Sequence, residues 1–156
     1  MDITTAITEI RNKTNDRDKV GLDDSELLSY LNEAIQYIAN YLISIKSPIV
    51  VADFTANTTT TTLPDNFAKL AGGFPVKRTG NEIQLLVEPP IKIRYLVSYP
   101  TVTTSDDMPF EYESLNQSAI KLACIYANSQ KQTDVTQDKS LLDEVNAAIE
   151  RAVSEN

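Results

Sequence analysis

Residues 24–45 constrain the fold of this chain most, because their aliphatic side chains recur at the spacing of one face of an α-helix. These side chains are Leu27, Leu28, Leu31, Ile35, Ile38 and Leu42. Asp23-Asp24-Ser25-Glu26 precedes them and is close to a capping box, in which two residues three positions apart bond each other's backbone N–H groups. The segment therefore predicts one long helix with an apolar face.

A second stripe, which contains Tyr30, Tyr37 and Tyr41, lies beside the aliphatic face of this predicted helix. The two stripes together cover about half of the helix circumference, whereas a surface helix of a monomer needs a stripe of little more than about 100°. The tyrosines therefore either cover another part of the same chain or form a subunit interface, where tyrosine is enriched. The sequence leaves both interpretations open.

Three further helices are predicted from apolar periodicity. The first, at about 3–13, follows Asp2, a residue type that caps helix starts. The others span about 110–130 and 140–154. The polar stretch 15–21 contains a glycine and predicts a solvated connector between the first two helices.

The middle of the chain has the character of β-structure. Residues 49–54 are rich in β-branched side chains, and the threonine run 58–62 predicts an edge strand or an extended arm. Thr79-Gly80-Asn81 predicts a hairpin turn that needs a positive φ. Residues 91–99 alternate between apolar and mostly polar side chains, which predicts a strand packed on helices on one side and exposed to water on the other.

These elements predict an α+β fold: a bundle of about four helices, two of them long, with a small antiparallel β-sheet or hairpin region inserted between the second and third helices. A single domain spans 1–156, with helical parts at about 2–46 and 110–154 and a β region at about 48–100. A chain of this length buries enough surface to form a core without metals or disulfides.

The catalytic inventory of the sequence is nearly empty. The chain has no His, and its one Cys is Cys124, which excludes His-based acid–base chemistry, the usual zinc sites and a disulfide within one chain. No nucleotide-binding, nucleophile-elbow or zinc-protease pattern occurs. We therefore predict that the protein is not an enzyme and has no catalytic residues, cofactor or metal ion, and a hydrolase built on carboxylates is the least favoured alternative.

Three local features have both a structural and a functional interpretation. Cys124 lies on the apolar side of the predicted third helix, which favours a buried structural thiol over a nucleophile. Asp106 and Asp107 favour a solvated turn over a metal site, because no partner carboxylate stands at a recognisable spacing. Four basic residues of the β region form either solvated strand faces or a small basic patch. They are Lys77, Arg78, Lys92 and Arg94.

The chain carries 14 basic and 22 acidic residues, a formal net charge of −8. This balance argues against a surface that grips nucleic acid, since duplex binding depends on basic side chains. No apolar run reaches the roughly 18 residues that suffice for a membrane helix, and no signal peptide is visible. We therefore expect no association with membranes.

Three short patterns occur in a fixed order along the chain. The first, from Asp23 to Ala34, reads DDSELLSYLNEA. The second is Leu63-Pro64-Asp65-Asn66-Phe67, and the third is Asp107-Met108-Pro109-Phe110, with a strand ending in Tyr99-Pro100 upstream. Together they resemble the head-to-tail adaptor proteins of tailed bacteriophages, also called connector or head-completion proteins. Leu22 departs from this family, in which many relatives carry an aromatic residue before the acidic pair.

The resemblance implies a structural virion protein that forms a ring, typically of twelve copies, in the neck between capsid and tail. Such a ring is assembled in the host cytoplasm, docks on the portal protein and contacts tail or nozzle proteins. It extends the channel, through which DNA passes without specific binding. In this family the C-terminal segment, here 140–154, commonly reaches the portal, and β loops commonly face tail components.

We expect interface residues among side chains that combine exposure in an isolated subunit with chemistry favoured at interfaces. They are Tyr30, Tyr37, Tyr41, Phe54, Thr60 and Arg94. Two other functions stay open. One is a tail-side neck or tail-tube-associated structural protein, which would have a larger β content, and the other is a cytoplasmic protein-interaction domain.

Overall fold

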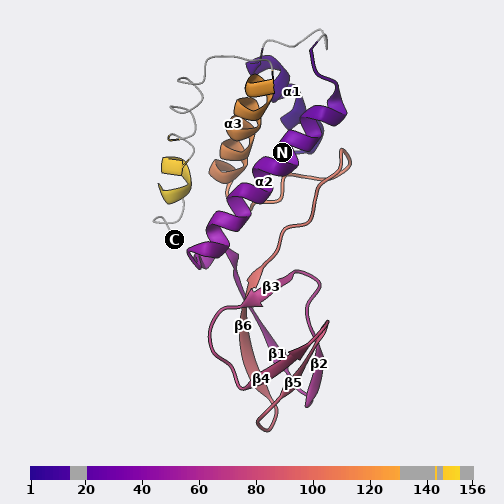
Figure 1. The fold of residues 1–156 in the computed structure, drawn as a ribbon, viewed down its shortest axis with the longest axis vertical. Helices are drawn as coiled ribbons and strands as arrows, with labels where there is room; N and C mark the ends of the chain where they lie inside the picture. The colour runs from indigo at the N-terminus through magenta and orange to yellow at the C-terminus, as the bar shows by residue number, and fades with distance from the viewer. Residues whose placement is uncertain (15–20, 131–142, 144–145, 152–156) are drawn as a thin grey trace. The chain divides into compact units, whose positions relative to one another are not determined.

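The computed structural model describes residues 1–14, 21–130, 143 and 146–151. The chain divides into two compact units (Figure 1). The helical unit consists of Met1–Asn40 and Thr101–Asn156, and the β unit consists of Tyr41–Pro100. That the whole chain forms one adaptor domain stays a prediction.

The three long helices are α1 (Ile3–Lys13), α2 (Asp24–Ser44) and α3 (Glu113–Gln130). Their bounds confirm the helices predicted for residues 3–13 and 24–45, and the third begins three residues later than predicted. Residues 143 and 146–151 are helical as well. The rest of the predicted helix 140–154, like residues 15–20 of the predicted connector, lies outside the described residues.

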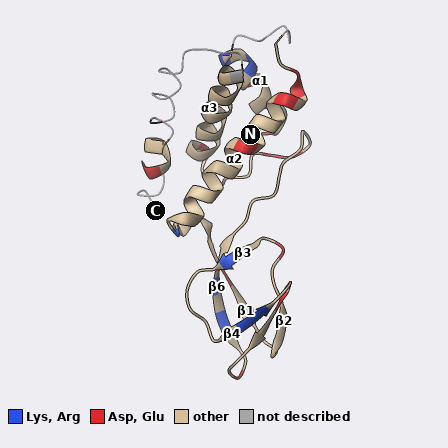
Figure 2. Ribbon diagram, in the orientation of Figure 1, with Lys and Arg blue, Asp and Glu red and all other residues tan. Residues whose placement is uncertain are grey.

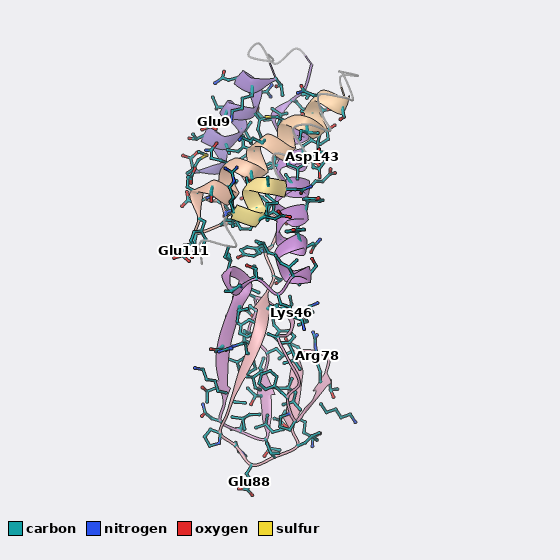
Figure 3. All side chains as sticks on the ribbon, turned by 90° about the vertical axis from the view of Figure 1, so that its left-hand side faces the viewer. Glu9, Lys46, Arg78, Glu88, Glu111 and Asp143 are labelled. Carbon is teal, nitrogen blue, oxygen red and sulfur yellow. The ribbon has the colours of Figure 1, made fainter. Side chains whose placement is uncertain are left out.

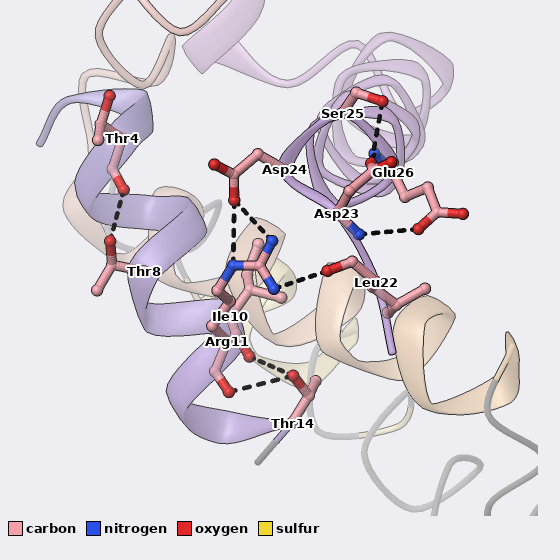
Figure 4. Close-up of polar contacts among 10 residues, drawn as sticks. All are labelled: Thr4, Thr8, Ile10, Arg11, Thr14, Leu22, Asp23, Asp24, Ser25 and Glu26. Atoms are coloured by element: carbon pink, nitrogen blue, oxygen red, sulfur yellow. Dashed lines mark hydrogen bonds and ion pairs between the residues drawn. The ribbon is translucent and has the colours of Figure 1, made fainter. Parts of the chain in front are cut away.

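Carboxylates cap the first two helices. The Asp2 Oδ1 atom accepts a hydrogen bond from the Thr5 N–H at 2.8 Å at the start of α1. At the start of α2, Asp23 Oδ1 accepts from the Glu26 N–H at 2.8 Å, and Glu26 Oε2 accepts from the Asp23 N–H at 2.9 Å (Figure 4). This reciprocal pair is the capping box that the sequence predicts.

A buried arginine ties α1 to the chain that enters α2. Arg11 is 5% exposed, and its Nη1 group donates a hydrogen bond to the Leu22 carbonyl at 2.7 Å (Figure 4). Its Nη2 and Nε groups donate to Asp24 Oδ1 at 2.6 and 3.1 Å. The guanidinium therefore has both a carboxylate and a carbonyl partner, as a buried charge requires.

Aliphatic side chains from all three helices form the core of the helical unit. The largest fully buried ones are Ile3, Ile10, Leu27, Leu31, Ile35, Ile38, Leu115 and Ile120. Ile149, in the helical stretch 146–151, is also completely buried. Burial of such side chains stabilises the folded unit by about 1.5–3 kcal/mol each.

Two asparagine side chains hold the segment between the β unit and α3 against the helices. Asn32 of α2 accepts a hydrogen bond from the Val102 N–H at 2.7 Å and donates to the Val102 carbonyl at 3.0 Å. Asn116 of α3 makes the same pair of contacts with Phe110, at 3.2 and 2.9 Å. Each side-chain amide therefore forms hydrogen bonds with both the N–H and the C=O of one buried residue. We call these two pairs of contacts the asparagine clamps.

The β unit contains one 3-10 helix, η1, and six short strands. They are η1 (Pro48–Val50), β1 (Val51–Ala56), β2 (Thr60–Thr62), β3 (Phe67–Leu70), β4 (Val76–Thr79), β5 (Glu82–Leu85) and β6 (Ile91–Val97). The strands form two antiparallel sheets, in the orders β1-β6-β3 and β2-β5-β4.

One apolar cluster joins the two sheets. Ala56 and Ile93 come from the first sheet, Ile83 and Leu85 from the second, and Leu63 from the chain between β2 and β3. The buried Tyr95 ring contacts Phe54 edge-on and stacks on Phe67, with centroid distances of 5.7 and 5.6 Å. The sheets therefore enclose a core of their own.

The structure contradicts the predicted fold class of a bundle of about four helices with one small β-sheet or hairpin region. Two three-stranded sheets stand where one was expected, and the predicted strand at 91–99 shares its apolar cluster with the second sheet. The prediction missed β3, because four residues are too few to show an alternating pattern. It also did not pair the threonine run with the hairpin.

The structure confirms the predicted hairpin, and of the two alternatives for the threonine run, edge strand or extended arm, it shows the edge strand. β4 and β5 pair from Val76↔Leu85 to Thr79↔Glu82, and Gly80, the first turn residue, has φ +60°. A positive φ at this position of a two-residue hairpin turn favours glycine. β2 pairs only with β5, so its other side is a sheet edge. Beside this edge, the Thr58 hydroxyl donates to the Thr60 carbonyl at 2.7 Å, and the Thr61 hydroxyl donates to the Thr58 carbonyl at 3.1 Å.

Loss of the first asparagine clamp is expected to destabilise the protein. We expect Asn32→Ala to lower the free energy of unfolding by about 2 kcal/mol, since the buried Val102 N–H and C=O lose their partners. Urea unfolding followed by circular dichroism measures this change. Asn40→Ala is the matched control, because Asn40 lies exposed on the same helix. Equal effects of the two substitutions would show that the clamp does not stabilise the unit.

Candidate functional site

The six predicted interface residues are divided between the two units. Tyr30 and Tyr37 belong to the helical unit. Tyr41, Phe54, Thr60 and Arg94 belong to the β unit. The six therefore do not form one surface within either unit, and their role at an interface stays a prediction.

Tyr37 is the most exposed member of the tyrosine stripe on α2. It is 37% exposed, whereas Tyr30 and Tyr41 are half-buried. Its hydroxyl donates a hydrogen bond to Asn146 Oδ1 at 3.2 Å. An open hollow of about 470 Å³ lies beside it and is lined by polar residues of α2 and by Tyr126 of α3, whose pKa is raised chiefly by burial. Tyr37 therefore combines a partner within the chain with an accessible ring.

The structure places Phe54 and Thr60 differently from each other. Phe54 is half-buried and packs against the apolar cluster of the β unit, where its ring meets Tyr95. We expected Phe54 to be exposed in an isolated subunit, but its ring packs in the core of this unit. Thr60 is exposed on the edge strand β2. Its accessibility therefore agrees with the expected one.

Arg94 belongs to a charge cluster on the first sheet. Its Nε atom donates a hydrogen bond to Asp53 Oδ1 at 3.0 Å across the β1–β6 pair, and Lys92 Nζ lies 3.6 Å from Asp53 Oδ2. The hydrogen bond from Arg94 is the main cause that holds the pKa of Asp53 below its usual value, and the charges of Arg94 and Lys92 add to it. The cluster carries two cations and one anion, so a net positive charge remains.

The four basic residues predicted as solvated faces or a small patch lie on two different sheets. Lys92 and Arg94 are on β6, and Lys77 and Arg78 are on β4 (Figure 2). The Arg78 guanidinium lies 5.0 Å from the centre of the Phe67 ring, and its Nε atom donates to the Gly80 carbonyl at 3.0 Å. Arg78 is thus engaged locally.

Lys46 is a candidate binding residue that the sequence reasoning missed. It follows the end of α2, adopts φ 51° and lines an open hollow of about 430 Å³ together with Arg94 and Ala71. A second hollow of about 300 Å³ shares Arg94 and Ala71 and includes Lys92. The sequence gives one signal for Lys46, since a lysine just after a helix and before Ser47-Pro48 is placed near the carbonyl end of that helix.

Cys124 and Asp106 have the structural roles that the sequence favours. Cys124 is 6% exposed, and burial raises the pKa of its thiol to about 11. Asp106 Oδ2 accepts hydrogen bonds from the Thr103 N–H at 2.7 Å and from the Thr103 hydroxyl at 2.9 Å, which lower its pKa. Within the described part of the chain, no three His, Cys, Asp or Glu side chains are grouped to hold a metal ion.

No family model and no curated protein matches this chain. None of the helices in the described ranges has the length and apolar character needed to cross a membrane.

Removal of Arg94 is expected to shift the titration of Asp53. Arg94→Gln should raise the pKa of Asp53 toward its ordinary value, and Lys92→Gln should raise it less, because the Arg94 hydrogen bond is the largest cause of the shift. Titration of the carboxyl carbons by NMR measures both changes. A larger shift in the Lys92 variant would contradict this assignment.

The same cluster predicts a pH dependence of stability. Because the pKa of Asp53 is lowered by folding, its contribution is present above the unfolded pKa and is lost as the pH falls through the folded pKa. We therefore expect Arg94→Gln to remove stability at neutral pH and to have a smaller effect under acid conditions below both values. Urea midpoints measured across that pH range test this expectation.

Cys124 is expected to resist thiol reagents in the folded protein. A pKa raised from 9.0 to about 11 reduces the thiolate fraction about 100-fold near pH 8, and burial restricts access further. We expect the reaction with a chromogenic disulfide reagent to be at least about 100-fold slower in buffer than in 6 M guanidinium. Comparable rates in the two solutions would place the thiol at the surface.

Proposed function

We propose that this protein is a structural virion component that forms a ring in the neck of a tailed bacteriophage, between the portal of the capsid and the tail. The order of the three sequence patterns is the observation that carries this proposal. Each pattern lies at a boundary between elements of the structure, where it directs the path of the chain. These positions support the proposal, because the three patterns keep their order from one element boundary to the next.

The first pattern forms the start of α2 and includes residues of two of its hydrogen-bonded motifs. Asp23 and Glu26 form the capping box, and Asn32 is the residue of the first asparagine clamp. The pattern therefore includes both the residues that begin the helix and the residue that holds Val102, which is distant in the sequence.

The second pattern includes a turn before β3, and the third lies shortly before α3. In the second, the Phe67 N–H donates to the Pro64 carbonyl at 3.1 Å, and Asn66 Oδ1 accepts from the Tyr95 hydroxyl at 2.9 Å, where the chain enters β3. In the third, the Met108 N–H donates to the Met1 carbonyl at 2.8 Å, and Phe110 is held by the second clamp before α3.

The charge of the chain is compatible with a channel protein. The helical unit contains 18 acidic and 8 basic residues, a net charge of −10. A surface of this sign repels phosphate and lets DNA pass without specific binding wherever it faces the channel. The partners of the proposed ring are the portal protein, tail or nozzle proteins and further copies of this chain, typically twelve in total.

One observation favours a second candidate, a tail-side neck or tail-tube-associated structural protein. Such a protein is expected to have more β-structure than a helical adaptor, and the β unit contains two sheets where one small region was predicted. Binding to the portal separates the two candidates, because a tail-side protein would bind a tail tube instead.

Co-sedimentation with the portal ring of the same phage tests the proposed function. We expect a complex with about one copy per portal subunit, counted by mass photometry. A folded chain that fails to bind the portal and binds the tail tube would overturn the adaptor assignment in favour of the tail-side candidate. Failure to bind either would favour a cytoplasmic interaction domain.

The tyrosine stripe provides a point test of the same proposal. We expect Tyr37→Ala to weaken assembly on the portal at least about tenfold while the thermal midpoint changes little, because the ring is exposed. Tyr112→Ala is the matched control, since Tyr112 has the same 37% exposure. If Tyr37→Ala unfolds the monomer and the surviving protein still assembles, the stripe belongs to the core.

A further inference from the structure

The two units of the chain carry opposite net charges. The β unit contains 6 basic and 4 acidic residues, a net charge of +2, whereas the helical unit has a net charge of −10. The overall value of −8 conceals this difference. Because protein interfaces bring surfaces of opposite charge together, the two units offer complementary surfaces to other copies of the chain.

The positive charge of the β unit is concentrated along two adjoining hollows. We call them together the basic groove, and its lining includes Lys46, Val51, Asp53, Ala71, Lys92 and Arg94. The hollows meet at Ala71 and Arg94, with Lys46 in one hollow and Lys92 in the other. Figure 3 labels Lys46 on the ribbon of the β unit.

The cations of the groove have unused hydrogen-bonding capacity. Lys46 has no carboxylate partner among the described residues, and the Lys92 side chain is 71% exposed. The Nε group of Arg94 donates to Asp53. The two terminal amino groups of Arg94 have no hydrogen-bond partner within the described part of the chain. Such a pair of N–H donors matches the two oxygens of a carboxylate.

We propose that the basic groove binds carboxylates on the helical unit of a second copy of this chain. The inference rests on the proposed ring and identifies the surface through which neighbouring copies meet. The net charge of −10 on the helical unit supplies the complementary partner. Asp53 within the groove offsets one cation, which limits attraction for a continuous phosphate backbone and makes nucleic acid the less favoured occupant.

A contact between the β unit of one copy and the helical unit of the next is heterologous. A row of copies joined in this way has a free groove at one end and a free helical unit at the other. Further copies can therefore add until the rotation between neighbours closes the row into a ring. The overall charge of −8 keeps free copies apart at low concentration, so the contact is weak in solution and strengthens when copies are gathered.

Zero-length cross-linking of isotope-mixed protein tests the contact directly. Equal amounts of ¹⁴N- and ¹⁵N-labelled full-length chain are treated with a carbodiimide at about 1 mM protein, where a contact with a Kd near 1 mM is substantially populated. We expect mixed-isotope peptides that join Lys46 or Lys92 to Asp or Glu of residues 1–40 or 101–156. The short Lys92–Asp53 pair provides an internal control, because it cross-links within one copy.

Salt and matched variants make the result specific. We expect the mixed-isotope links to fall at least about fivefold between 0.05 and 0.5 M salt, since exposed charges are screened. We expect Lys46→Glu with Lys92→Glu to lose them. The control is Lys13→Glu with Lys77→Glu, which replaces two lysines outside the groove and gives the chain the same net charge as the groove variant. In this control the mixed-isotope links should persist.

Several results would overturn the proposal. They are an absence of mixed-isotope links at Lys46 and Lys92 while the Lys92–Asp53 link forms, equal loss of links in both double variants, and links that join the groove to another groove. DNA binding that only the groove variant loses, with unchanged self-contact, would assign the groove to nucleic acid. None of these measurements uses the portal, so failure of the contact is distinguishable from failure of the proposed function.

Discussion

The helical unit depends on the asparagine clamps, because they supply hydrogen-bond partners to buried backbone groups, which apolar packing cannot do. The segment that returns from the β unit has no strand partner along most of its length, yet Val102 and Phe110 are buried there. Backbone groups that leave water need partners, and the amides of Asn32 and Asn116 supply a donor and an acceptor to each of these residues. The positions of α2 and α3 along this segment are thereby defined by directional contacts.

The β unit is organised by a different constraint. Its strands are three to seven residues long, so no single sheet buries enough apolar surface alone. The two sheets share one cluster, and the buried ring of Tyr95 contacts aromatic side chains from β1 and β3. Polar and charged side chains then line the outer face of the first sheet, where Asp53 pairs with Arg94 and Lys92. Packing inside and charge outside together shape the basic groove.

The sequence predicted the elements whose signals are local. The helices at 3–13 and 24–45, the capping box and the turn at Gly80 all depend on residues within a few positions of one another. The pairing of the threonine run with β5 and the addition of β3 to β6 were missed, because they depend on contacts that no short pattern contains. Lys46 was missed for the same reason, because the hollow that it shares with Arg94 joins residues that lie far apart in the sequence.

The free edge of β2 bears on the resistance of the chain to aggregation. An exposed strand offers unpaired backbone groups to other chains and can seed fibrous aggregates. Here the strand has only three residues, and the hydroxyls of Thr58 and Thr61 already occupy the carbonyls of Thr60 and Thr58. A foreign strand must displace these hydroxyls before it can pair there. The threonine run thereby lowers the tendency of this edge to add a further strand and to start cross-β stacking.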